Sequence, residues 1–124
     1  MQAIVLFAHG SRDPLWHKPI QAVAERIRQR APHMVVRCAY LELTEPNLPN
    51  VVNVLMCEGI TSICVVPMFL GVGRHAREDL PQLIETIKTN HPTLTIECQP
   101  SVGEQTVLLD LLAEIALGHG NKLT

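Results

Sequence analysis

Two histidines and a glutamate lie just beyond segments of this chain that are apolar enough to be buried strands. His9 follows the first such run and precedes Gly10, Glu42 follows the second, and His75 lies in the loop after the third. Imidazole nitrogen and carboxylate oxygen suit borderline divalent ions such as Co²⁺, Fe²⁺ and Ni²⁺, and these groups can also accept protons near neutral pH. For one histidine alone, an ordinary loop residue is the better interpretation. Two histidines in the loops of adjoining strands instead favour a metal or proton-transfer site.

Three arginines bring positive charge to the same loops, although the chain is slightly acidic as a whole. Arg12 lies in the first loop, and Arg74 and Arg77 lie on either side of the histidine in the third. Guanidinium groups bind carboxylates through two parallel hydrogen bonds. These loops therefore offer carboxylate clamps beside the metal or proton site, although Arg77 and Glu78 can equally be solvated surface.

The few aromatic residues gather at the same ends of the expected strands. These side chains could form the apolar walls of a site for a flat ligand, with Met68 and Leu70 filling the gaps between them. An equal alternative is that they are core residues that close one end of the sheet. The aromatic residues concerned are Phe7, Trp16, Tyr40 and Phe69.

Strand and helix patterns that alternate along the chain position these loops. Apolar spacings of three and four, continuous apolar runs, and caps at Asp13, Asn47 and Asp79 mark the boundaries. Four such units predict an α/β fold of one domain, a three-layer α/β/α architecture with a four-stranded parallel sheet and its ligand site at the carboxyl edge. The domain covers 1–118, and a tail covers 119–124. The expected strands are 2–8, 34–40, 62–68 and 94–99, and the expected helices are 14–30, 48–58, 80–90 and 104–117.

The last expected helix is apolar over much of its circumference. A helix of this kind needs more cover than one face of a sheet provides, so we expect a subunit interface there. Its apolar residues are Val107, Leu108, Leu109, Leu111, Leu112, Ile115 and Leu117.

Composition excludes several classes of protein. A net charge of −2 and a pI near 6.3 give no basic surface for nucleic acid. No apolar run reaches the length of a membrane span, and the start of the chain lacks the positive region of a signal peptide. The four cysteines form no C-x-x-C pair, and we interpret them as reduced, buried residues of a cytoplasmic protein without a metal role.

Three motifs taken in order resemble one known family. They are A-H-G-S-R after the first strand, L-E-L-T-E-P-N-L-P after the second, and V-P-M-F-L-G-V-G-R-H-A-R-E-D-L-P after the third. Together they resemble the small sirohydrochlorin chelatases of the CbiX type, the half-length members of the class II chelatases. The resemblance covers the chain from Ile4 to about Leu117.

The resemblance implies insertion of a divalent metal, Co²⁺ first, with Fe²⁺ or Ni²⁺ as alternatives, into sirohydrochlorin, a tetrapyrrole with eight carboxylates. The metal is a substrate, and no organic cofactor is implied. Longer relatives carry two such domains, so a single copy implies a homodimer. The active-site histidines carry over as His9 and His75, which would bind the metal and accept protons, and the acidic partner carries over as Glu42. As a hypothesis, Ser11, Arg12 and Arg74 would bind the substrate carboxylates, and Phe69 would be part of the apolar wall.

Two other classes of function are weighed against this one. A non-catalytic carrier of metal or tetrapyrrole would use the same residues without turnover. A histidine phosphatase also has His-Gly after its first strand, but it needs an arginine immediately before that histidine, and Ala8 stands there.

Overall fold

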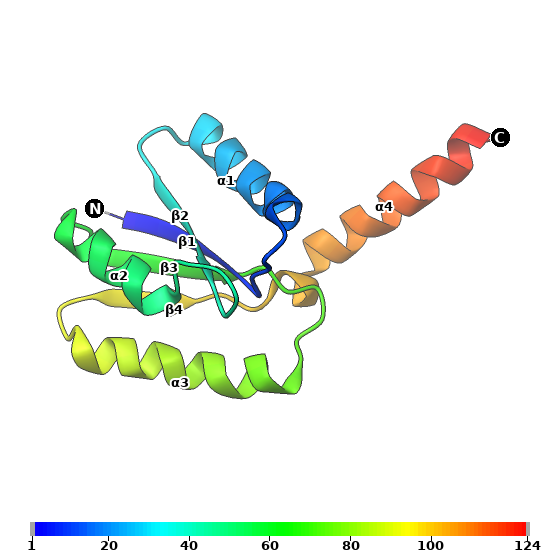
Figure 1. Cartoon of the computed structure of the whole chain (residues 1–124). Helices are drawn as coiled ribbons and strands as arrows, with labels where there is room; N and C mark the ends of the chain where they lie inside the picture. The colour runs from blue at the N-terminus through cyan, green and yellow to red at the C-terminus, as the bar shows by residue number, and fades with distance from the viewer. Residues whose placement is uncertain (1, 124) are drawn as a thin grey trace.

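Residues 2–123 are described by a computed structural model, with side chains over 2–118 (Figure 1). Strands and helices alternate along the whole chain, as the sequence predicts. The elements are β1 (Gln2–Ala8), the 3₁₀ helix η1 (Pro14–His17), α1 (Lys18–Arg30), β2 (Val35–Tyr40), α2 (Leu48–Cys57), β3 (Ser62–Pro67), α3 (Arg74–Asn90), β4 (Thr95–Cys98), the 3₁₀ helix η2 (Val102–Glu104) and α4 (Thr106–Leu123).

The four strands form one parallel sheet in the order β2-β1-β3-β4. Ala3 of β1 is in register with Val35 of β2 on one side and with Ile63 of β3 on the other. Because β1 lies between β2 and β3, the loops that follow these three strands leave the sheet side by side. The expected parallel sheet is confirmed, and so is the adjacency of the strands that precede His9 and His75.

Helices cover both faces of the sheet, and each face has its own apolar core (Figure 1). Side chains alternate across a strand, so Val5 and Phe7 pack on the side of α2 and α3, whereas Leu6 and Ala8 pack on the side of α1. This is the predicted three-layer α/β/α arrangement. None of the helices in the described part of the chain is both long enough and apolar enough to cross a bilayer.

Helix α4 projects away from the sheet (Figure 1), and its large apolar side chains are exposed. The helix begins at Thr106 and continues to Leu123, beyond the end expected at 117. The tail expected over 119–124 is therefore helical as far as Leu123, and Thr124 lies outside the described residues. The boundary between a domain over 1–118 and a tail stays a prediction. The exposed apolar side chains of α4 are Val107, Leu109, Leu111, Leu112, Ile115 and Leu117.

The start of α3 differs from the prediction. A cap at Asp79 was expected to begin the helix near Leu80, but the helix begins at Arg74 after Gly73, and Pro81 lies inside it. The missing N–H of proline costs one helical hydrogen bond, yet packing of an apolar stripe outweighs that local signal. The stripe consists of Ala76, Leu80, Leu83, Ile84 and Ile87, which all contribute to the core on this face.

Two predicted caps are confirmed. The Asp13 carboxylate accepts a hydrogen bond from the Leu15 N–H at 2.9 Å at the start of η1, where Pro14 follows the cap. The Asn47 side chain accepts one from the Asn50 N–H at 2.9 Å at the start of α2. Each satisfies a donor that the first turn of a helix leaves free.

The four cysteines are all free, three in strands and one at the end of α2, and they are less buried than expected. Cys57 and Cys98 are exposed, and Cys38 and Cys64 are half-buried. The expectation of burial is wrong because β2 and β4 are the edge strands and Cys57 ends α2. Burial raises the pKa of the Cys38 thiol, and the Arg28 charge opposes that rise.

The loop after β2 is hydrogen-bonded along the loop after β1. The Leu41 N–H donates to the Ala8 carbonyl at 2.8 Å, and the Glu42 N–H donates to the His9 carbonyl at 2.9 Å. Gly10 has a φ of +98°, and a Cβ built on it would lie 1.9 Å from the Glu42 carbonyl oxygen. Only glycine satisfies both conditions, the left-handed backbone and the close approach.

Replacement of Gly10 by alanine tests this contact. Gly10→Ala is expected to lower the free energy of unfolding by about 2 kcal/mol or more, because a side chain is strained at this φ and the Glu42 carbonyl must move. Thermal unfolding followed by circular dichroism measures the loss. Gly71→Ala is the matched control, since nothing lies within 4 Å of a Cβ added there. Equal stability of the two variants would contradict the close approach.

Candidate active site

His9 is presented to solvent on a buried aromatic platform. Its ring lies on Phe69, with the ring centroids 4.4 Å apart and the ring planes at 43°. Phe69 in turn packs edge-on against Phe7 at 6.0 Å. The two phenylalanines are about 1% exposed, whereas His9 is exposed. The end of β1 and the start of the loop after β3 therefore support the His9 imidazole on its buried side.

Phe69 does not have the position expected of it. It was expected to line an apolar wall for a flat ligand, but at 1% exposure its ring is covered by His9 and the core. The Met68 N–H donates to the Phe7 carbonyl at 2.7 Å, which continues the pairing of β1 with β3 and keeps Phe69 over the core. The ring therefore supports His9 instead of facing solvent. A role for Phe69 in binding a substrate stays a prediction.

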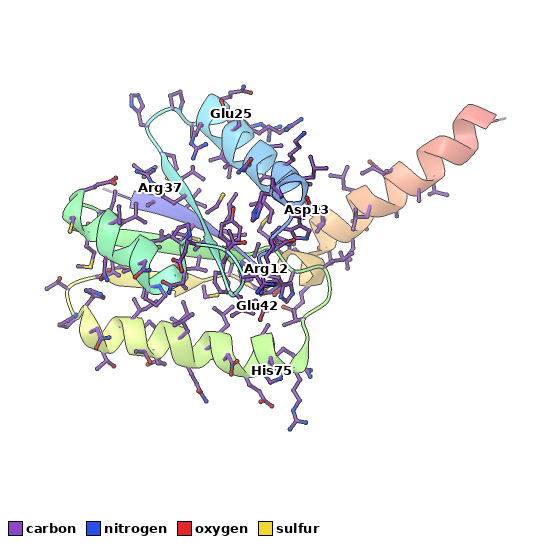
Figure 2. All side chains as sticks on the ribbon, in the orientation of Figure 1. Arg12, Asp13, Glu25, Arg37, Glu42 and His75 are labelled. Carbon is purple, nitrogen blue, oxygen red and sulfur yellow. The ribbon has the colours of Figure 1, made fainter. Side chains whose placement is uncertain are left out.

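His75 lies in the first turn of α3, six residues after Phe69 along the chain. Its side chain is exposed, as is that of Glu42 in the loop after β2. Figure 2 shows Arg12 and Glu42 beyond the carboxyl ends of the strands, and His75 where α3 begins, at the same end of the molecule. The predicted candidates thus come to one edge of the sheet from two loops and from the first turn of α3.

The side chains described over residues 2–118 contain no ready three-ligand metal site. Among the side chains of residues 2–118, no group of three or more His, Cys, Asp and Glu lies close enough together to hold a metal ion. His9, Glu42 and His75 are therefore neighbours at one edge of the sheet and not a preassembled ligand set.

The basic side chains at this edge are open to solvent. Arg12 is exposed, and the Arg74 side chain is 83% exposed while its Nε lies 3.1 Å from the Glu78 carboxylate one turn along α3. An exposed pair of this kind contributes little to stability, so Arg74 can exchange Glu78 for another carboxylate. Arg77 is also exposed, which agrees with the interpretation of solvated surface.

Thr44 and His17 received no role from the sequence, yet both bind the loop that carries His9. The Thr44 hydroxyl accepts a hydrogen bond from the Ser11 N–H at 3.1 Å and donates one to the Ser11 carbonyl. The His17 Nε2 also lies 2.9 Å from that carbonyl. The signal for Thr44 was its place in the second motif, L-E-L-T-E-P, but spacing along the chain does not reveal a contact across 33 residues.

The remaining aromatic residues form a second cluster around His17. Its ring meets Tyr40 edge-on at 5.0 Å and Trp16 edge-on at 5.2 Å. Burial raises the pKa of the Tyr40 phenol, and the neighbouring Cys38 thiol adds to the rise. Three of the four aromatic residues, Phe7, Tyr40 and Phe69, are buried plugs, and only Trp16, at 37% exposure, reaches solvent.

A large cavity among the described residues lies beside α3 and does not include the candidate side chains. It measures about 820 Å³ and is a groove between α3 and the end of β4, lined on its apolar side by Ala76, Leu80, Ile84 and Ile96. Neither His9, Glu42 nor His75 lines it. His9, Glu42 and His75 instead lie on an open surface.

Comparison with known sequences identifies related proteins. The CbiX family model matches residues 3–117. A sirohydrochlorin cobaltochelatase of Methanococcus aeolicus is 36% identical over 88 residues, which are 71% of this chain and 62% of that protein. Another, from Methanococcoides burtonii, is 28% identical over 122 residues, covering 92% of this chain and 93% of that one. The chain thus spans less than two thirds of the Methanococcus relative and nearly all of the Methanococcoides one.

Solved structures agree with this assignment. A CbiX protein from Marinobacter aquaeolei VT8 superposes with a TM-score of 0.84 at 31% identity, over 98% of this chain and 99% of that chain. The sirohydrochlorin chelatase SirB from Bacillus subtilis subspecies spizizenii, in complex with cobalt, has a TM-score of 0.72 at 28% identity, over 85% of this chain and 45% of that chain. The family model, the relatives and the shared fold lead to one conclusion: this chain belongs to the CbiX family.

Proposed function

We propose that this protein inserts a divalent metal ion, Co²⁺ first, into sirohydrochlorin. The observation that carries the proposal is the match to the CbiX family over 3–117, in a fold whose three motif-bearing loops meet at one edge of the sheet. Relatives named sirohydrochlorin cobaltochelatases support the reaction, and SirB structures with cobalt or with Fe³⁺ support a metal ion as substrate.

His9 and His75 would receive the metal and the protons. Insertion breaks two pyrrole N–H bonds, forms metal–nitrogen bonds in the ring and releases two protons, while the ion loses its bound water. A neutral imidazole can bind a divalent ion transiently or accept one of these protons. The support on Phe69 gives His9 a defined position for either task.

Glu42 would orient one of the imidazoles or add a carboxylate ligand while the metal passes. Its backbone N–H is bonded to the His9 carbonyl, which keeps its loop beside this histidine. Ser11, Arg12 and Arg74 would bind the acetate and propionate groups of the macrocycle. The exposure of the two arginines at an open surface supports this assignment.

Co²⁺ is proposed as the preferred ion, with Fe²⁺ and Ni²⁺ as competitors. Imidazole and carboxylate ligands suit all three ions, so the choice depends on geometry and on supply. Turnover of sirohydrochlorin with the three metals in parallel, followed by absorbance, ranks them directly. The proposal expects the fastest turnover with Co²⁺.

Removal of either imidazole tests the mechanism. His9→Ala and His75→Ala are each expected to reduce the rate of metal insertion by about 100-fold or more, because a group that transfers protons or binds the ion is lost. His33→Ala is the matched control, since His33 lies in the turn between α1 and β2, at the other end of the strands. Near-normal rates in both site variants, with the fold intact by circular dichroism, would refute the mechanism.

Stoichiometric binding without turnover would identify a carrier of metal or tetrapyrrole instead of a chelatase. Equilibrium titration with Co²⁺ and with sirohydrochlorin, run beside the turnover assay, separates the two outcomes.

Loss of the Arg74 charge, which is proposed to bind a substrate carboxylate, gives a different kinetic signature. Arg74→Gln is expected to raise the KM for sirohydrochlorin about fivefold or more while kcat stays within about twofold, because the charge contributes to binding and not to the metal exchange. Arg26→Gln, another exposed helical arginine, is the control. An unchanged KM in Arg74→Gln would remove Arg74 from the substrate site.

We further propose that the protein is a homodimer whose subunits cover the open surface of α4. Six apolar side chains of this helix are between 38% and 79% exposed, and burial of such surface favours association.

The free cysteines suit the reducing cytoplasm, where we propose that the protein acts.

Oligomeric state tests the role of α4. Light scattering is expected to give about twice the chain mass of 13.7 kDa. The double variant Leu111→Glu with Ile115→Glu is expected to give a folded monomer, because charges are then placed on the apolar surface. Glu114→Gln on the same helix is the control. A monomeric parent protein would contradict the proposal.

A further inference from the structure

We propose that Thr44 and His17 are positioning residues for the loop after β1, which carries His9, and that they act through the peptide groups of Ser11. This inference rests on the proposed function, because it assigns these residues to the same site. Thr44 and His17 do not contact the substrate themselves. They hold in place the segment that carries His9 and Arg12.

Thr44 binds both polar groups of Ser11 with one hydroxyl. The Ser11 N–H donates to Thr44 Oγ1 at 3.1 Å, and that hydroxyl donates to the Ser11 carbonyl. The contact is half-buried and joins residues 33 apart along the chain. It therefore acts as a single cross-link between the loop after β1 and the loop after β2.

His17 provides a second donor to the same carbonyl. Its Nε2 lies 2.9 Å from the Ser11 oxygen, and because a carbonyl only accepts, this nitrogen must carry the hydrogen. Edge-on contacts with Trp16 and Tyr40, at 5.2 and 5.0 Å, restrict the rotation of its ring. The Ser11 carbonyl is thus fixed from two directions.

The conformational freedom of Gly10 explains why the loop after β1 needs the hydrogen bonds to Ser11. The His9 carbonyl is already bonded to the Glu42 N–H, but the backbone next passes through Gly10, which has a φ of +98°. A glycine adopts many conformations, so without restraint on its far side the peptide could rotate. The bonds at Ser11 supply that restraint and thereby limit the movement of His9 on Phe69.

The expected kinetic effect is larger on turnover than on substrate binding. Thr44→Val keeps the shape but removes the hydroxyl, and we expect kcat to fall about tenfold because the imidazole is misaligned. A smaller rise in KM is expected as well, because Ser11 and Arg12 lie in the same loop. Thr44→Ser restores the hydroxyl and should recover at least half of the parent kcat. His17→Ala should reduce kcat and His17→Gln, which can still donate, should recover part of it. Rates are measured well below the Tm of each variant.

Thr86→Val is the matched control, because the Thr86 hydroxyl also donates to a backbone carbonyl, that of Gln82, on the exposed side of α3. It should leave kcat unchanged. A second measurement does not depend on activity: the NMR signal of the His9 ring carries the ring-current shift of Phe69, which lies 4.4 Å away. This signal is expected to move in Thr44→Val and to remain in place in Thr44→Ser.

Three results would overturn the inference. The first is a Thr44→Val protein with parent kcat, whether or not its Tm falls. The second is reduced kcat with an unmoved His9 signal. The third is an equal loss of kcat in Thr86→Val. If the parent protein shows no turnover of sirohydrochlorin, the proposed function fails, and the His9 signal still decides whether Thr44 positions the ring.

Discussion

The parallel pairing of β1 with both β2 and β3 is the constraint on which the rest of the structure depends. It places a strand that is buried from Val5 to Ala8 at the centre, and the chain then enters solvent at His9, between the loops of the two neighbouring strands. The same pairing brings Phe69, just past the end of β3, beneath His9. The packed interior of a protein deforms little, so the buried Phe7 and Phe69 rings give His9 a firm support.

The candidate site combines a restrained side with an open side. On the restrained side, backbone bonds at His9 and the bonds to Ser11 join the first two loops. On the open side, His75 and Arg74 extend from the exposed first turn of α3, with room around the preceding glycines. A site of this kind suits a reaction in which one group must hold its geometry while another approaches a large, flat substrate.

Helix α4 departs from the pattern of the other three helices. Helices α1, α2 and α3 bury an apolar stripe on the sheet, but α4 exposes its apolar residues along a projecting rod (Figure 1). Burial of apolar surface is the main favourable term in folding and in association. A second copy of the chain would supply for α4 the cover that the sheet supplies for the others.

Local patterns in the sequence determined the order and type of the elements, the parallel sheet and two helix caps, because apolar period and capping act over a few residues. The motifs also identified His9, Glu42 and His75 as residues to examine, and all three reach one edge of the sheet. Only the tertiary structure decided that α3 begins at Arg74, since packing of its stripe outweighs the local signals at Asp79 and Pro81. It also decided that Phe69 supports His9 and that Thr44 binds Ser11, because such contacts depend on which distant segments the folded sheet brings together.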